Sequence, residues 1–284
     1  MKQLFLTFSI IFSLILASCE TKTSSEGNIE TKADSIPPDH TQVAKQDTQG
    51  IMSKGSLTLI PLAGSPEFSD AALELNSPEE NAKVKSGDVT FSYEVKNYQL
   101  KNQTPTGSCN QCNNSKDGQH IHLILNNEPY IAIYEPTHKQ NLKDGHYVAL
   151  SFLSRSYHES IKSFQAFDLR QFTVGKGEPK KIDLKKPLLF YSRPKGEYTG
   201  EFSKRILLDF YLINTELSTE GNKVRATING TEFILPKWQP YIIEGLPMGE
   251  TTIKIELIDA EGKLVDSPFN SVERKITLKQ EAAS

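Results

Sequence analysis

The chain has 284 residues, of which 37% are hydrophobic and 24% charged, and its formal net charge is −3. This composition is sufficient to bury real hydrophobic cores. The absence of a basic excess argues against nucleic acid as a partner.

The first eighteen residues have the order of charge, apolar core and small residues that is typical of a secretory signal peptide. Lys2 precedes an apolar stretch from Leu4 to Leu16, which is shorter than the roughly 20 residues that a bilayer-spanning helix needs. The run Leu-Ala-Ser-Cys that ends at Cys19 resembles the lipobox of bacterial lipoproteins. That resemblance implies that Cys19 is acylated and becomes the N-terminus of the mature protein, with several acyl chains holding it stably on a membrane.

Cys19 is followed by Glu20, not by the aspartate that tends to retain enterobacterial lipoproteins at the inner membrane. The sequence therefore predicts an outer-membrane lipoprotein, and leaves open whether it faces the periplasm or the outside.

Residues 19–55 are rich in Thr, Ser, Lys, Glu and Asp. Such a segment buries too little apolar surface to offset its ordering entropy, so we expect a disordered tether there.

Beyond the tether, short runs alternate apolar and polar residues and are separated by turn dipeptides such as Asp144-Gly145 and Asn229-Gly230. Many short strands with turns between them predict an all-β protein built from antiparallel sandwiches. The clearest expected strands are 89–95, 121–125, 148–153, 206–213 and 253–258.

An internal repeat indicates two copies of one fold. Residues 121–174 align with residues 224–278 at an offset of 102 to 104, with Leu125-Asn126 against Ile228-Asn229. Each copy has the size of an immunoglobulin-like sandwich. We therefore expect a first sandwich over 56–177 and a second over 178–284.

Two segments carry resemblances to known families. Residues 76–91, with a Ser-Pro, a polar turn and a valine before the first long strand, resemble the start of bacterial immunoglobulin-like and fibronectin-like modules. Residues 57–280 are similar to a group of largely uncharacterised Bacteroidota lipoproteins with a Gly-Gln-His-Ile-His strand, here 118–122, and a Ser-Arg-Ser-Tyr-His-Glu segment, here 154–159. The resemblance implies fold and location, and no established activity.

Five of the six histidines lie within thirty-nine residues of the first copy, and the second copy has none of them. Side chains two apart on a strand share a face, so His120 and His122 project together while Ile121 and Leu123 point to the core. His146 follows the Asp144-Gly145 turn and is expected to reach the same face if its strand is a neighbour. His158 is expected to form a structural pair with Glu159, and His138 to lie in an exposed loop.

Cys109 and Cys112 lie just before the histidines and have two open interpretations. In an exported protein such a pair forms a disulfide, or its thiolates complete a metal site with His120, His122 and His146. Cys₂His₂ and His₃ sets suit zinc or copper. The alternatives for the histidines are an exposed sheet face that is simply polar, or hydrogen bonds that order the loop above the sheet.

None of the common catalytic motifs is found, so the sequence favours a non-enzymatic protein. An enzyme built on the same histidines would need an open coordination position and an acid or base, for which Glu128 and Glu159 are the candidates.

Trp238, flanked by Pro236 and Pro240, is either a packing residue or a stacking platform for a sugar. The sequence thus predicts a ligand-binding envelope lipoprotein, with zinc or copper as the ligand, or else an adaptor that binds an envelope protein or a glycan.

Overall fold

The computed structural model describes residues 50–105, 109, 112–180 and 182–281. The predicted signal peptide, the predicted acylation site Cys19 and most of the predicted tether lie outside these residues. The described part contains eighteen strands, one short 3₁₀-helix, η1 (Gly200–Ser203), and no α-helix. The all-β prediction is confirmed. No helix within the described ranges is long and apolar enough to cross a bilayer.

The first sandwich packs a three-stranded sheet, β3-β5-β8, against a five-stranded sheet, β4-β10-β9-β6-β7. All neighbouring strands are antiparallel except β4, which runs parallel to β10. Alternate side chains of both sheets, such as Phe91, Ile121 and Leu123, form its core. The strands are β3 (Ala72–Ser77), β4 (Lys83–Val84), β5 (Gly87–Lys96), β6 (His120–Leu125), β7 (Ile131–Ile133), β8 (Thr137–Leu142), β9 (Gly145–Ser154) and β10 (Phe167–Val174).

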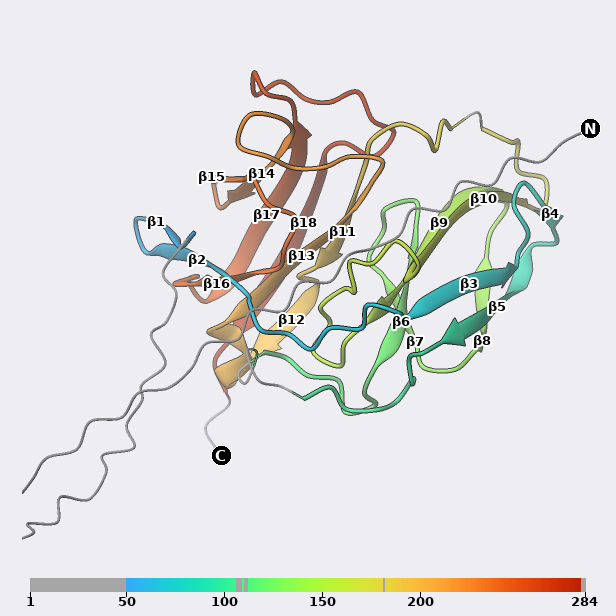
Figure 1. Cartoon of the computed structure of the whole chain (residues 1–284), viewed down its shortest axis with the longest axis horizontal. Coiled ribbons are helices and arrows are strands. Elements are labelled where there is room, and N and C mark those ends of the chain that lie inside the picture. The colour runs from blue at the N-terminus through green and yellow to red at the C-terminus, as the bar shows by residue number, and fades with distance from the viewer. Residues whose placement is uncertain (1–49, 106–108, 110–111, 181, 282–284) are drawn as a thin grey trace, which may run out of the picture. The chain divides into compact units, whose positions relative to one another are not determined.

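The second sandwich repeats this arrangement. Its sheets are β12-β18-β17-β14-β15 and β11-β13-β16, and β12 again runs parallel to the last strand, β18. The shared strand order makes each sandwich immunoglobulin-like and confirms the repeat (Figure 1). The strands are β11 (Leu188–Arg193), β12 (Gly196–Thr199), β13 (Ile206–Ile213), β14 (Lys223–Ile228), β15 (Thr231–Leu235), β16 (Tyr241–Glu244), β17 (Gly249–Ile258) and β18 (Val272–Lys279).

The repeat extends to a single hydrogen-bonding device. Asn126 and Asn229 follow equivalent strands, and both adopt a positive φ, of 52° and 46°, which asparagine tolerates better than most residues. The side-chain oxygen of Asn126 accepts a hydrogen bond from the amide of Val148 at 2.8 Å, and that of Asn229 accepts one from Thr252 at 2.9 Å. The two asparagines therefore tie equivalent turns to equivalent strands.

The start of the described chain corrects the predicted domain limits. β1 (Met52–Lys54) forms a hairpin with β2 (Leu57–Pro61), and β2 pairs with β16 of the second sandwich. In Figure 1 this blue hairpin lies beside β16. Residues 52–54, expected in the tether, are therefore a strand, and residues 57–61, expected in the first sandwich, extend the second. The physical reason is burial, because Leu57 and Leu59 enter the core of the second sandwich.

Strands β6, β9, β11 and β13 are buried on both faces over most of their length. Their second faces meet in a separate apolar cluster that includes Ile124 and Phe152 from the first sandwich and Phe190 and Tyr211 from the second. The ring centroids of Phe152 and Tyr211 are 4.7 Å apart. Both sandwiches belong to one compact unit, and this junction buries the histidine face of β6.

Candidate metal centre at the junction of the sandwiches

His120 and His122 lie on the face of β6 that points away from the core of the first sandwich. Ile121 and Leu123 enter that core, as the period of two predicts. His120 and His122 are both 0% exposed, because the second sandwich covers them. The alternative of a solvated polar sheet face therefore does not apply.

A third histidine, His158, reaches the pair from the loop between β9 and β10. Its backbone has φ of 70°, a left-handed conformation that is strained for a bulky residue and often marks a functional site. The loop is fixed around it. The amide of His158 donates to the carbonyl of Arg155 at 2.9 Å, and the Arg155 guanidinium pairs with Glu159 at 3.1 Å.

The three rings converge on one point through defined nitrogen atoms. The Nε2 atoms of His120 and His122 are 2.9 Å apart, and Nδ1 of His158 lies 3.1 Å from Nε2 of His120. One nitrogen of each ring lies within 4.8 Å of those of the other two. Ligands on a tetrahedral zinc at 2.0–2.1 Å are about 3.3 Å from each other. The spacing of the nitrogens therefore suits joint ligation of a single ion.

The outward nitrogens of the β6 pair are held by the surrounding backbone and side chains. Nδ1 of His120 donates to the carbonyl of Gly118 at 2.7 Å, and Nδ1 of His122 lies 3.3 Å from Oγ of Ser192 on β11. Partners of this kind orient ligand histidines in metal sites. Gly118 has φ of 81°, and a Cβ there would lie 2.2 Å from the Lys101 carbonyl, so this position requires glycine.

Burial keeps all three rings neutral near pH 7. Loss of solvation lowers the pKa of His120 to about 4. It also lowers the pKa values of His122 and His158 well below the usual range, with smaller contributions from the neighbouring charges. Neutral imidazole is the form that binds metals.

The neutral rings of the cluster carry one N–H proton each for their hydrogen bonds. The Gly118 carbonyl uses the single N–H of neutral His120, so its Nε2 presents a lone pair. Two other ring nitrogens approach that lone pair, and the hydroxyl of Tyr130 lies 3.2 Å from Nδ1 of His158. Nδ1 of His158 carries either one proton or one lone pair, and it lies within hydrogen-bond distance of both the Tyr130 hydroxyl and Nε2 of His120. A cation among the rings would accept all three lone pairs at once.

Aromatic and cationic groups surround the cluster. The Tyr130 ring stacks on His122 with centroids 3.5 Å apart, and the Nζ atom of Lys195 lies 3.7 Å from the Tyr130 centroid. Arg193 donates to the Tyr198 hydroxyl at 2.9 Å. Burial, with help from the neighbouring guanidinium groups, lowers the pKa of Lys195 to about 8. The Nζ atom of Lys195 also donates to the Tyr130 carbonyl at 2.7 Å.

The cluster meets solvent only at the edge of His158, which is 8% exposed. His158 borders a crevice of about 10 Å³, roughly the space of one water molecule. Arg193 and Arg205 line the same crevice.

The structure corrects the predicted ligand set at His146. His120 pairs with Ser154 across β6 and β9, whereas His146 pairs with Thr173 at the other end of β9. Eight residues of strand separate the two ends, about 26 Å. The Nε2 atom of His146 contacts Gln171 at 3.1 Å instead.

The two cysteines are joined by a disulfide, which was one of their two interpretations, so neither sulfur is a free thiolate. Both are buried with Tyr157 in a small apolar cluster next to His158. The disulfide thus packs with Tyr157 and lies outside the histidine group.

Two further predictions about side chains are wrong. His138 lies on strand β8, not in a loop, and its Nε2 atom is 3.3 Å from the Gln140 side-chain oxygen. Glu159 does not pair with His158, because it is bound by Arg155 and by the hydroxyl of Ser65. Of the two acids considered for catalysis, Glu159 is therefore held in an ion pair and Glu128 is exposed.

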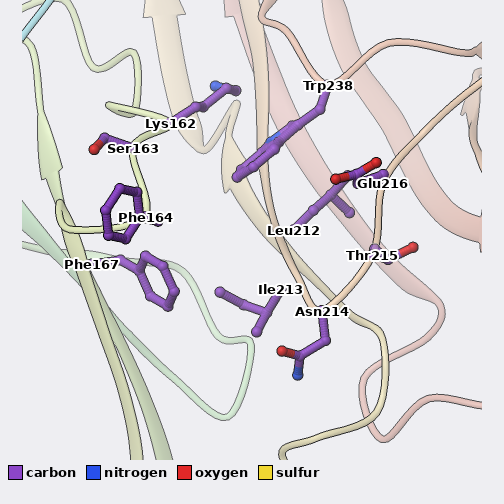
Figure 2. A pocket seen from close by; sticks show the side chains of 10 residues that line it. All are labelled: Lys162, Ser163, Phe164, Phe167, Leu212, Ile213, Asn214, Thr215, Glu216 and Trp238. Carbon is purple, nitrogen blue, oxygen red and sulfur yellow. The ribbon is translucent and has the colours of Figure 1, made fainter. Parts of the chain in front are cut away.

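Trp238 lines a separate pocket of about 820 Å³ at the junction. Its Nε1 atom donates to the Phe210 carbonyl at 2.9 Å, and its ring packs edge-on against Tyr211. Figure 2 shows Phe164 and Phe167 across the pocket from Trp238 and Ile213. Trp238 is thus a packing residue that also forms part of the wall of this pocket.

No family model matches the sequence, and no curated protein is significantly similar to it. Solved structures with some likeness include the fibronectin(III)-like modules of CbhA from Clostridium thermocellum, at 14% identity and a TM-score of 0.26 over 73% of this chain and 94% of that one. The Ig1-2 module of the Drosophila receptor protein tyrosine phosphatase DLAR matches at 10% identity and a TM-score of 0.23, over 74% of this chain and all of that one.

SGBP-B of the Bacteroides ovatus mixed-linkage glucan utilization locus, solved with a mixed-linkage heptasaccharide, matches at 11% identity and a TM-score of 0.21 over 72% of this chain and 47% of that one. None of these likenesses carries an argument about ligands or activity.

Proposed function

We propose that the protein is a non-enzymatic lipoprotein of the outer membrane, acylated at Cys19, that binds one zinc or copper ion through His120, His122 and His158. The observation that supports metal binding is the convergence of three neutral ring nitrogens on one buried point, with the Gly118 carbonyl taking the only N–H of His120. Neutral imidazole suits both metals.

The metal experiment is elemental analysis of the purified protein, without a His-tag, after dialysis against trace zinc and copper. The parent is expected to hold one equivalent of metal per chain, and His122→Phe, which keeps a ring against Tyr130, is expected to hold none. His146→Gln is the matched control, because it removes a histidine of the same domain that lies at the far end of β9. A parent that stays metal-free after loading with either ion would refute the proposal.

The anchor has a separate test. Cells that express the parent are expected to incorporate labelled palmitate into the protein and to retain it in the outer-membrane fraction, whereas Cys19→Ala should be unlabelled. Equal labelling of both forms would contradict the lipoprotein part of the proposal. Accessibility of the intact-cell protein to an external protease then separates a surface location from a periplasmic one.

A second candidate function, an adaptor that binds an envelope protein or a glycan, is favoured by the pocket beside Trp238. Phe164 at its rim is 82% exposed, and together with Phe167, Leu212 and Ile213 it gives the pocket the apolar, aromatic lining that is typical of ligand sites. Asn214 and Glu216 add polar groups to the same wall. Cross-linking of the parent and of Phe164→Ser in intact cells tests this function. If the adaptor function is correct, the parent forms cross-linked adducts that Phe164→Ser does not form.

A further inference from the structure

The charges around the histidine cluster are unusual for a site that binds a divalent ion. All three ring ligands are neutral, and the atoms that contact them belong to a carbonyl, a serine hydroxyl and a tyrosine hydroxyl. Within the described ranges, no carboxylate joins the group of candidate ligands. The donor set itself therefore offers no negative charge to an incoming cation.

Two cations lie close to the cluster without an acidic partner. His122 and the Lys195 ammonium each lie within 4 Å of the Tyr130 ring centroid, so they occupy opposite faces of that ring. The Arg193 guanidinium lies 5.2 Å from the same centroid. No ion pair of Lys195 or Arg193 with an acid is found among the described residues. Their positive charge is therefore uncompensated at the site.

We infer that this site selects a monovalent soft ion, Cu(I), over Zn(II). The inference rests on the proposed metal-binding function and specifies the ion. The cost of transferring an ion into a buried site grows with the square of its charge, and its repulsion by Lys195 and Arg193 grows in proportion to that charge. Zn(II) therefore pays about four times the desolvation cost and twice the repulsion of Cu(I).

The number of ligands supports the same choice. Three imidazole nitrogens complete a trigonal Cu(I) site, whereas zinc in a closed protein site takes four donors. The nearest further donor is the Tyr130 hydroxyl, 3.2 Å from Nδ1 of His158, and a phenol hydroxyl is not among the usual protein ligands of zinc. The site is thus complete for Cu(I) and lacks a good donor for Zn(II).

The test is a pair of competition titrations on the purified full chain. Cu(I) is measured against bathocuproine disulfonate under anaerobic conditions, with ascorbate as the reductant so that the Cys109–Cys112 disulfide stays intact. Zn(II) is measured against a fluorescent zinc chelator. We expect Cu(I) to bind at least a hundredfold more tightly than Zn(II), and Ag(I), which has the same charge and no accessible redox change, to compete with Cu(I).

Charge variants separate electrostatic selection from ordinary ligand preference. Lys195→Gln should strengthen Zn(II) binding relative to Cu(I) by on the order of tenfold, the size expected for one unit charge near a partly exposed site. Lys263→Gln, an exposed lysine in a turn of the second sandwich, should change neither affinity. Circular dichroism of each variant confirms that it is folded.

The outcomes distinguish this inference from the function on which it rests. If Zn(II) binds to the three histidines as tightly as Cu(I), the selectivity is refuted and metal binding stands. If Lys195→Gln changes both affinities equally, selection by charge is refuted and metal binding stands. If neither ion binds, the proposed function fails and the inference fails with it.

Discussion

At the scale of single residues, the histidine cluster brings together groups that water would otherwise solvate. Its members are fully or nearly fully buried, and His158 also holds a strained backbone. Burial of polar rings and backbone strain both destabilise the fold unless a ligand or a hydrogen bond offsets them. The cluster is therefore expected to affect stability as well as binding.

The metal-free protein should lose stability as the pH falls from about 6.5 to about 4. The pKa of His120 is near 6.5 in the unfolded chain and about 4 in the folded protein, so the unfolded chain binds more protons in this range. The contribution of the neutral ring to the free energy of unfolding is complete above pH 6.5 and is lost as the pH falls through 4. The loss is on the order of 3 kcal/mol for this residue alone. Urea unfolding of chelator-treated protein at several pH values measures it.

The control for this prediction is His138→Asn, which removes a histidine on β8 that lies outside the cluster. It should leave the pH dependence unchanged, whereas His120→Asn should flatten it. An equal dependence in both variants would mean that other groups control the acid sensitivity.

The sequence predicts the two β6 ligands because they depend only on the period of a strand. The third ligand depends on a loop conformation that no periodicity encodes. The sequence offers one signal for it, the polar segment Ser154–Glu159 that contains His158. In the structure Glu159 of this segment pairs with Arg155 and not with His158. The sequence cannot place His146, because it does not give the antiparallel register of β6 and β9, and this register determines which end of β9 faces His120.

At the scale of strands, the repeat is predictable because equivalent turns and core residues recur at a nearly constant offset of 102 to 104 residues. The hairpin β1-β2 was not, because its two strands are short and its partner strand β16 lies about 180 residues later in the chain. Pairing across such a separation leaves no local pattern in the sequence. What the sequence does show is the apolar alternation of Leu57 and Leu59, and only the fold reveals which core they enter.

Leu59→Ala should destabilise the second sandwich and not the first. Leu59 is 0% exposed in the core shared with β16 and β13, and truncation of a buried leucine costs about 2–5 kcal/mol. Hydrogen exchange should therefore accelerate in Tyr241–Glu244. Leu264→Ala, at a leucine that is 51% exposed, should cost no more than about 0.5 kcal/mol. Faster exchange in β3 and β5 instead would place the hairpin with the first sandwich.

At the scale of the whole molecule, the junction explains why the site exists in only one of two similar sandwiches. The first sandwich supplies the three ligands, and the second covers them with β11 and supplies Ser192, Arg193 and Lys195. The equivalent face of the second sandwich offers Lys223 and Arg225 on β14, where Arg225 pairs with Glu256 at 2.8 Å. The ligand site is thus a product of the pairing of the sandwiches rather than of either fold alone.

Ser192→Ala should weaken metal binding about 10- to 100-fold even though Ser192 belongs to the second sandwich and binds no metal itself. Its hydroxyl orients the His122 ring from 3.3 Å, and removal of such a partner typically has an effect of this size. The matched control is Ser151→Ala, which removes a buried hydroxyl 3.0 Å from the Tyr93 hydroxyl inside the first sandwich. Competition titration with Cu(I) should separate the two variants, while urea unfolding of the metal-free forms should show similar losses of stability. Equal Cu(I) affinities in the two variants would mean that the second sandwich only shields the site. A selective loss of affinity in Ser192→Ala would show that the second sandwich also aligns the ligands. Metal binding and the docking of the two sandwiches would then stabilise each other.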